Sequence, residues 1–351
     1  MRKKSTVGML LIAILVVSAS FYPVDAYITK PGGAYPLDPL VKVEGGDKDD
    51  VGSMSLMTIS LAKATPVTYA WAKISDQQKI LQTNQVRNPD EDDEEYNVRQ
   101  LHLMSQSQFS AIHVAYEKAD KPYEIISRGV FILNVLPDGA ADGLLKAGDR
   151  ILQIDHLKNS DQQSLIDYLS EKKLGEVITL QVERDDKLET IEVELKPIPT
   201  EESRVGLGIT FTEDKEITTT PLVNIGADDI GGPSAGLMFT LEILNQLVDE
   251  DLTKGYNVAG TGTMQSSGEV GRIGGIDLKV IAADNEGIEI FFAPDDDLPE
   301  SVMNDNPTLR SNYEDAKEQA EKIGTKMKIV PVKTIDDALA YLEKLEPKQT
   351  K

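Results

Sequence analysis

The sequence predicts a mixed α/β (α+β) protein with more than one domain. Its 351 residues are more than a single domain of ordinary size contains. Hydrophobic residues make up 40% of the chain and charged residues 27%, which is the composition of a globular protein rather than a disordered one. Runs with strand-like patterns and runs with helical periodicity follow one another along the chain. We therefore expect folded domains that contain both helices and sheets.

The composition limits the binding partners and the catalytic groups that the chain can have. A net charge of -23 repels phosphate backbones and anionic lipid headgroups, so we expect no nucleic-acid partner. The chain has no cysteine, and its histidines, His102, His113 and His156, stand in no metal-ligand spacing. We expect no metal and no cofactor. Any serine chemistry must find a base other than histidine.

The N-terminal residues 1–26 have the pattern of a membrane-inserting segment. Three basic residues at positions 2–4 precede an uncharged apolar run from Val7 to Val24. The run is long enough either to span a bilayer once or to serve as a signal that is cleaved near Val24-Asp25-Ala26. In both cases the positive-inside rule places the chain after Tyr27 outside the cytoplasm, at the cell membrane or secreted.

Residues 27–122 mix strands with one long helix. The runs "SLMTISLAK" (55–63) and "PVTYAWAKI" (66–74) are both expected to be strands. The acidic run "DEDDEE" (90–95) is a solvated loop or a helix entry rather than a calcium site, because no Asp-x-Asp-x-Asp-Gly loop accompanies it. A helical pattern follows from Glu94 to Lys118.

Residues 123–198 change to short strands and turns. A Pro-Asp-Gly turn and a Lys-Ala-Gly-Asp turn separate the first strands, Asp161 begins a helix, and "VITLQVER" and "LETIEVELK" are closing strands. With the stretch "LKAGDRILQIDH" (145–156), this order resembles a PDZ domain of the type found in bacterial extracytoplasmic proteases, over about 75 residues.

The PDZ resemblance implies a peptide-binding groove. Such domains accept an extended peptide as an added strand between one strand and the main helix, here Ser127–Asn134 and Gln162–Leu169. An alternative is that the module only packs as a spacer. The residues expected to line the groove are Gly129, Val130, Ile132, Leu165 and Ile166.

Residues 199–351 are predicted to form a mixed α/β domain. The strands "VGLGITF" and "TTTPLVNIG" precede a helix from Ser234, and a second helix starts at Ile276. The apolar strand "IEIFFAP" (288–294) then leads into a helix, a strand and a helix at the C-terminus.

Ser234 stands in "GGPSAG", before a helix that is apolar nearly all round and must therefore be buried. The start of such a helix carries unpaired N–H groups and a partial positive charge, which suit a developing oxyanion. Gly231 and Gly232 allow a close approach of substrate. From these residues alone, Ser234 is either the helix cap or a nucleophile.

Lys279 lies on the edge of a buried stripe formed by Ile276, Val280 and Ala283. A lysine at such a place either extends its amine to solvent, pairs with a carboxylate, or loses its proton. Bringing the lysine pKa from about 10.4 to near 7 takes roughly 4–5 kcal/mol of desolvation. The neutral amine could then deprotonate a serine.

Together, "GGPSAG" and the lysine of "GxVGxIGGxxxK", 45 positions after Ser234, resemble the proteolytic domain of Lon-type serine peptidases. The resemblance implies a Ser–Lys dyad in which Ser234 is the nucleophile and Lys279 the general base. Thr261 matches the threonine that orients the lysine in that family; as a residue alone it could equally be a strand residue that faces solvent. Backbone N–H groups from Gly232 to Ala235 are the candidates for an oxyanion hole.

The chain departs from the Lon pattern at two positions. Gly231 stands where an aspartate usually precedes the serine by three residues, and Thr263 replaces the glutamate of the T-G-E motif. These changes bear on how the dyad and the substrate are positioned. No stretch fits the phosphate-binding motif G-x-x-x-x-G-K-[ST], so we expect an endopeptidase that works without ATP on peptides or on extended, unfolded segments.

With its PDZ-like and N-terminal segments, the chain resembles the membrane-anchored, PDZ-containing Lon-like proteases of Gram-positive bacteria. Residues 27–122 and 199–351 would then form one discontinuous catalytic domain into which residues 123–198 are inserted. Two other functions stay open: a catalytically silent, membrane-tethered PDZ scaffold, and a chaperone-like subunit of a larger assembly. Lon domains often form rings, so a homo-oligomer is a further expectation.

Overall fold

The chain folds into two compact units in the computed structural model, which describes residues 17–18, 20–46, 51–88, 91–158, 161–227, 230–297 and 309–348. The first unit joins residues 1–89 to residues 234–351, and the second unit is the continuous segment 90–233. Most of the predicted N-terminal membrane segment lies outside the described residues. Among the described helices, none has the length and apolar character needed to cross a bilayer.

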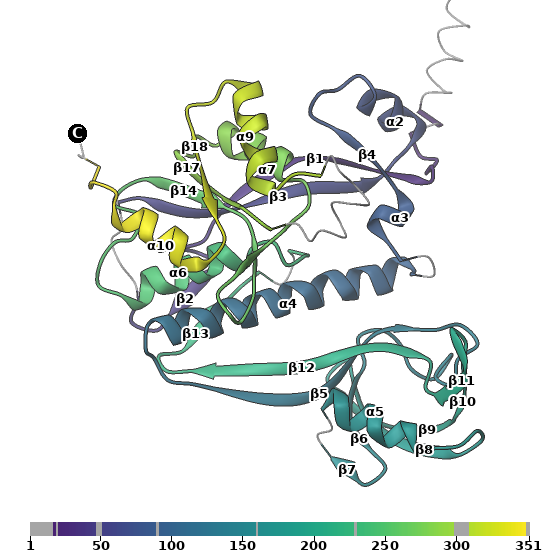
Figure 1. The fold of residues 1–351 in the computed structure, drawn as a ribbon. Helices are drawn as coiled ribbons and strands as arrows, with labels where there is room; N and C mark the ends of the chain where they lie inside the picture. Colours follow the sequence, from purple (N-terminus) through teal and green to yellow (C-terminus); the bar gives the residue numbers. More distant parts are fainter. Residues whose placement is uncertain are drawn as a thin grey trace, which may run out of the picture. The chain divides into compact units, whose positions relative to one another are not determined.

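The first unit is a three-layer α/β structure. Its six-stranded sheet has the order β18-β17-β14-β3-β1-β4, with α7 and α9 on one face and α6 and α10 on the other (Figure 1). The elements are β1 (Ala26–Pro36), β2 (Val41–Val43), β3 (Ser53–Lys63), α2 (Pro66–Ala72), β4 (Lys79–Gln82), α3 (Thr83–Val86), α6 (Gly236–Leu247), β14 (Asn257–Gly260), β15 (Thr263–Met264), β16 (Val270–Gly271), α7 (Ile276–Asn285), β17 (Ile290–Pro294), α9 (Asn312–Ile323), β18 (Lys328–Val332) and α10 (Ile335–Glu343).

The central strands of this sheet are parallel and covered on both faces. β14 pairs in parallel with β3 and with β17, and β17 pairs in parallel with β18. Every residue of β17 is buried, as expected for a strand that has helices on both sides. The predicted helices after Ser234 and from Ile276, and the C-terminal helix–strand–helix, are confirmed. α6 is buried nearly all round, as its apolar sequence predicts.

The run 66–74 forms the helix α2, so the prediction of a strand there is wrong. Thr65 caps this helix: its Oγ1 accepts from the N–H of Thr68, and Thr68 Oγ1 accepts from the N–H of Thr65 in return. Pro66 occupies the first turn, where its missing N–H does no harm. This capping box with a proline outweighs the alternation of apolar residues that favoured a strand.

The second unit contains one long helix and a strongly twisted antiparallel sheet of order β12-β5-β6-β8-β9. Its elements are α4 (Asp93–Lys118), β5 (Tyr123–Val135), β6 (Arg150–Ile154), β7 (Leu157–Lys158), α5 (Gln162–Ser170), β8 (Val177–Arg184), β9 (Lys187–Glu194), β10 (Lys196–Ile198), β11 (Glu201–Gly206), β12 (Ile209–Thr219) and β13 (Val223–Ile225). The predicted helix entry is confirmed, since Asp92 caps α4 and accepts from the N–H of Glu95. The predicted cap Asp161 likewise accepts from the N–H of Ser164 at the start of α5.

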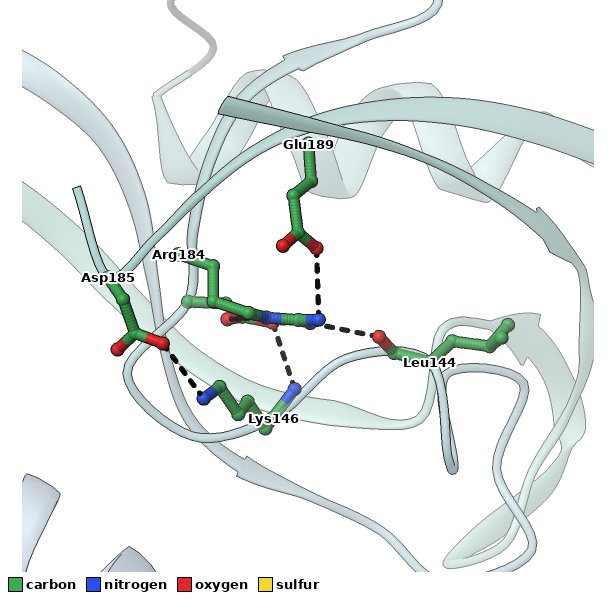
Figure 2. Close-up of polar contacts among 6 residues, drawn as sticks. Leu144, Lys146, Arg184, Asp185 and Glu189 are labelled. Carbon is green, nitrogen blue, oxygen red and sulfur yellow. Dashed lines mark hydrogen bonds and ion pairs between the residues drawn. The ribbon is translucent and has the colours of Figure 1, made fainter. Parts of the chain in front are cut away.

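A buried aspartate holds the turn in "LKAGDRI". Asp149 is fully buried and accepts from the N–H of Lys146 at 2.9 Å, which closes the turn. The guanidinium of Arg184 binds both oxygens of Asp149, at 2.7 and 2.6 Å, and so compensates the buried charge. Figure 2 shows the remaining partners of Arg184, the side chain of Glu189 and the carbonyl of Leu144. This stretch is therefore structural, and it ties the turn to the end of β8.

The second unit is larger than the predicted PDZ segment 123–198. β12 pairs with β5 along its full length, from Ile209 opposite Val135 to Thr219 opposite Tyr123. Helix α4 packs on the same two strands. Residues 90–122 and 199–233 therefore lie in the same compact unit as the PDZ-like segment. The pairing of β5 with β12 joins strands that are distant in the sequence, so the sequence pattern does not reveal this unit.

Candidate active site

Ser234 lies in a turn two residues before α6 and does not cap the helix. The N-cap position belongs to Ala235, and no side chain caps this end. Instead, the backbone carbonyl of Ser234 accepts from the N–H of Gly262 at 3.0 Å and from the Oγ1 of Thr261 at 2.9 Å. The side chain of Ser234 is half-buried, so a substrate could reach its hydroxyl.

Thr261 follows β14 directly, at the carboxyl end of a parallel strand, where sites in α/β sheets commonly lie. Its side chain is fully buried, so the alternative of a solvent-facing strand residue is wrong. Thr261 N–H donates to the carbonyl of Phe292 at 3.1 Å, which fixes the residue against β17. Its Oγ1 thus has one defined position between the carbonyl of Ser234 and the amine of Lys279.

Lys279 brings its amine to both hydroxyl groups. Its Nζ lies 2.7 Å from Ser234 Oγ and 2.9 Å from Thr261 Oγ1. The side chain is only 2% exposed, because most of the surrounding surface of α7 is also buried in the first unit. The alternative in which the lysine extends its amine to solvent is therefore wrong.

Burial lowers the pKa of Lys279 from its ordinary value of 10.5 to about 7. Desolvation is the sole cause: the low-dielectric surroundings disfavour the ammonium form. Asp228 and Asp229, the acidic residues nearest to Ser234 in the sequence, lie outside the described residues. At neutral pH a large fraction of this amine is uncharged, and its lone pair can accept the proton of Ser234 Oγ–H.

Of the N–H groups predicted to form an oxyanion hole, that of Gly232 is not available. Gly232 adopts φ +90, which favours glycine, and its N–H donates to the carbonyl of Gln100 at 3.0 Å. The prediction that Gly232 contributes to an oxyanion hole is therefore wrong. The N–H of Ala235, by contrast, donates to no acceptor in the described part of the chain. It stands at the positive end of α6, where an anionic oxygen is stabilised.

Helix α4 holds the residues that precede Ser234 in the chain, a role that the sequence did not reveal. Besides the bond from Gly232 to Gln100, the buried Ser107 donates its Oγ–H to the carbonyl of Pro233 at 3.0 Å. A Cβ at Gly231 would lie 3.0 Å from Gln100 Cβ, so a side chain there would require Gln100 to shift. These contacts join positions that are more than one hundred residues apart, and no local pattern marks them.

The predicted peptide groove lies elsewhere on the second unit. Val130, Ile132 and Leu165 are fully buried in its hydrophobic core, and Gly129 is paired within the sheet. Between Val130 and Ile132, β5 is bonded to β12 on one side and to β6 and the turn before it on the other, so this stretch has no free edge for a peptide. The prediction is wrong for these four residues. Only Ile166 lines a groove.

The observed groove, of about 310 Å³, runs between α5 and the segment 203–211. β12 is an edge strand of the described sheet, so its outer edge can accept an added strand. Two cations, Lys172 and Arg204, also line the groove. The apolar lining consists of Ile166, Leu169, Ile198, Val205, Leu207, Ile209 and Phe211.

No metal centre accompanies these sites in the part of the chain that the structure describes. It contains no group of three or more His, Asp or Glu side chains arranged to hold an ion.

Comparison with known proteins gives two domain matches. Residues 184–344 match the Lon protease (S16) C-terminal proteolytic domain, and residues 105–195 match the PDZ domain. The chain therefore contains a PDZ domain and a Lon C-terminal proteolytic domain in a mixed α/β structure. The proteolytic match includes Ser234, Thr261 and Lys279 and supports a serine peptidase.

Individual proteins match over shorter stretches. The Lon protease of Elusimicrobium minutum is 32% identical over 126 residues, which are 36% of this chain and 13% of that protein. The Lon protease of Vibrio parahaemolyticus is 27% identical over 159 residues, which are 45% of this chain and 18% of that protein. The PDZ domain of the SdrC-like protein from Listeria monocytogenes is 32% identical, with a TM-score of 0.24, over 25% of this chain and 92% of that domain. The matched stretches thus span less than a fifth of either Lon protease.

Proposed function

We propose that the protein is an ATP-independent serine endopeptidase that cuts extended polypeptide segments with a Ser234–Lys279 dyad. One observation carries the proposal: a buried amine with a pKa of about 7 lies 2.7 Å from a serine hydroxyl at a helix start. Neither histidine nor a metal is needed for this chemistry, because the neutral amine itself serves as the base.

In the first step, Ser234 Oγ attacks the carbonyl carbon of the scissile amide while its proton moves to Lys279 Nζ. Negative charge develops on the carbonyl oxygen, and the N–H of Ala235 at the start of α6 stabilises it. The resulting ammonium donates to Thr261 Oγ1, which therefore keeps the amine in line with Ser234. The C–N bond then breaks as the ammonium returns a proton to the leaving amine nitrogen.

In the second step, water removes the acyl group from Ser234. Lys279 Nζ, neutral again, takes a proton from the water, and the hydroxide attacks the ester carbonyl. When the C–Oγ bond breaks, the ammonium returns the proton to Ser234 Oγ and the carboxylate product leaves. One peptide bond and one water are consumed, and the dyad returns to its starting state.

The groove of the PDZ domain is the proposed recruitment site for substrate. Its apolar lining and the free edge of β12 suit an extended segment that adds as a strand. Lys172 and Arg204 suit a carboxylate at the end of that segment. Binding there would raise the local concentration of substrate for the proteolytic domain of the same molecule. A protease that receives substrates already in an extended form does not need ATP to unfold them.

We further propose that residues 7–24 anchor the protein in the membrane and that the two units face the extracytoplasmic side. The proposal rests on the uncharged apolar run and the basic residues before it. Cleavage of the segment would instead release the protein.

The direct test compares three purified proteins on unfolded casein and on a quenched fluorescent peptide, without nucleotide. We expect cleavage by the natural chain and a drop of at least about 10³-fold for Ser234→Ala and Lys279→Ala. Lys42→Ala, at an exposed lysine of the same unit, is the matched control and should cut normally.

Equal cleavage by all of these proteins would refute the enzyme assignment and leave the tethered PDZ scaffold. Cleavage that requires added ATP would refute the ATP-independent class while leaving the dyad in place.

A further inference from the structure

The outer face of α2 exposes apolar side chains that the fold does not use. Val67 and Trp71 are spaced i and i+4 and so lie on one side of the helix, and Ile74 stands in the turn that follows it. They are 37%, 59% and 75% exposed. The opposite side of the helix carries Ala72 and Tyr69, which pack into the protein. A group of three large, exposed apolar side chains is typical of an interaction surface.

α2 packs on β1, near the start of that strand (Figure 1). Val24 N–H donates to the carbonyl of Ala64 at 2.8 Å, one residue before the cap of α2. Val24 also packs in the same small cluster as Ala72. Phe21 and Tyr22, which directly precede this junction, are 81% and 73% exposed. We call the set the α2 patch; its members are Phe21, Tyr22, Val67, Trp71 and Ile74.

Lysines flank the α2 patch although the chain as a whole has a net charge of -23. Residues 60–88 contain four basic side chains and one acidic one, Asp76, and one of the four, Lys79, is paired with Asp277 at 2.7 Å. Lys63 and Lys73 flank α2 and are exposed, and Lys73 lies over the ring of Tyr69. Apolar and aromatic side chains bordered by lysines are the composition of a surface that binds the headgroup region of an anionic membrane.

We propose that the α2 patch inserts into the headgroup region of an anionic phospholipid bilayer. The inference rests on the membrane anchoring proposed above. Val67, Trp71 and Ile74 would add a second contact to the segment 7–24, because Val24 at the end of that segment is hydrogen-bonded to Ala64, just before α2. Tryptophan and tyrosine favour the boundary between lipid and water because their rings are amphipathic. A single flexible tether would let the unit rotate freely, whereas two contacts fix one orientation. β1 continues directly from this junction, and α7, which carries Lys279, packs on β1. The α2 patch thereby orients the dyad-bearing unit on the membrane.

The chain offers a direct probe, because Trp71 is its sole tryptophan. The full chain is reconstituted into vesicles of phosphatidylglycerol and phosphatidylethanolamine, with or without bromine on the acyl chains near the headgroup. Bromine quenches indole emission only at contact. Membrane insertion of the chain is measured separately by flotation, and proteolytic activity is measured in detergent.

We expect the chain to float and the emission of Trp71 to fall more than about twofold in brominated vesicles. The matched control is Trp71→Phe combined with Val51→Trp, a site of 67% exposure. Val51 precedes β3 and Ala64 follows it, so eleven strand residues separate the control from the α2 patch by roughly 35 Å. Emission from the control should not change.

Three results would overturn the inference, and each has a distinct meaning. A chain that floats with Trp71 unquenched has the anchor but no contact of α2 with lipid. A blue shift of Trp71 without bromine quenching assigns the α2 patch to protein instead of lipid. The contact is with a second copy if the shift depends on protein density, and within the same chain if it does not. A chain that cleaves peptides but does not float refutes the anchor while the proposed protease stands.

Discussion

Replacing Lys279 by methionine should stabilise the first unit while abolishing cleavage. Methionine matches the length and shape of the lysine side chain but carries no charge to bury. The natural residue is almost fully buried, and its amine has no carboxylate partner among the described residues to offset desolvation. Keeping this amine protonated therefore opposes folding. A merely structural lysine would show the opposite sign, with loss of stability on substitution.

The magnitude follows from the pKa. A fall from 10.5 to about 7 corresponds to roughly 5 kcal/mol between the folded and unfolded states. Because the folded-state pKa is lowered, the unfolded chain binds more protons between these two values, and the free energy of unfolding rises with pH across this window. Below pH 7 the destabilisation is present in full. Between pH 6 and pH 9, Lys279 should add about 2–3 kcal/mol to the stability of the natural chain and nothing to that of the variant.

The assay is denaturant unfolding in detergent at both pH values, followed by the fluorescence of Trp71, which lies in the same unit as Lys279. His102, whose pKa burial lowers, also makes stability rise with pH, but it is present in both proteins and cancels in the difference. Lys42→Met, at an exposed lysine, controls for the loss of a charge. An identical pH dependence for the natural chain and Lys279→Met would refute the reasoning.

The remaining predictions concern the residues around the dyad and the groove. Thr261→Val should lower kcat by about 10- to 100-fold and move the pH–rate profile to lower pH, since the ammonium loses an acceptor; Thr261→Ser should restore both. Ser107→Ala leaves the carbonyl of Pro233 without its donor and should lower kcat by up to about tenfold. The affinity for a peptide at the groove, measured by fluorescence anisotropy, should not change. An effect on this affinity alone would contradict a role of Ser107 in positioning Ser234. Ile166→Asp should raise KM for a peptide substrate about tenfold with kcat unchanged, and the exposed Gln163→Asp on the same helix is its control; equal KM values would argue against recruitment by the groove.

Periodicity and capping residues in the sequence correctly predicted helices whose signals lie within the helix itself. The helix from Ile276 and the long helix that ends at Lys118 were predictable because periodicity and capping residues lie within the element itself. The proximity of Ser234, Thr261 and Lys279 came from the resemblance to Lon-type peptidases and not from the residues alone. Burial of the lysine, which decides its protonation, was expected from its place on an apolar stripe.

Long-range pairing accounts for most of the wrong predictions. The groove was assigned to Ser127–Asn134 because nothing in that stretch reveals that β12 covers its edge. The same pairing joins the segment 199–233 to the compact unit that holds the PDZ-like segment, which no local pattern reveals. Gly232 was expected to face the substrate, but its N–H is bound by α4, whose residues lie far away in the sequence. The helix α2 is the exception. Its capping residues lie within the segment itself, but the alternation of apolar residues in 66–74 led to the prediction of a strand.

The protonation state of Lys279 can be measured directly by NMR. With ¹³C at Cε of every lysine, the resonance missing from Lys279→Met identifies this side chain, and its shift is followed from pH 5 to pH 11 in the full chain in detergent. A midpoint near 7 is predicted. A midpoint near 10.5, that of a solvated amine, would contradict the central claim that burial prepares this lysine to deprotonate Ser234.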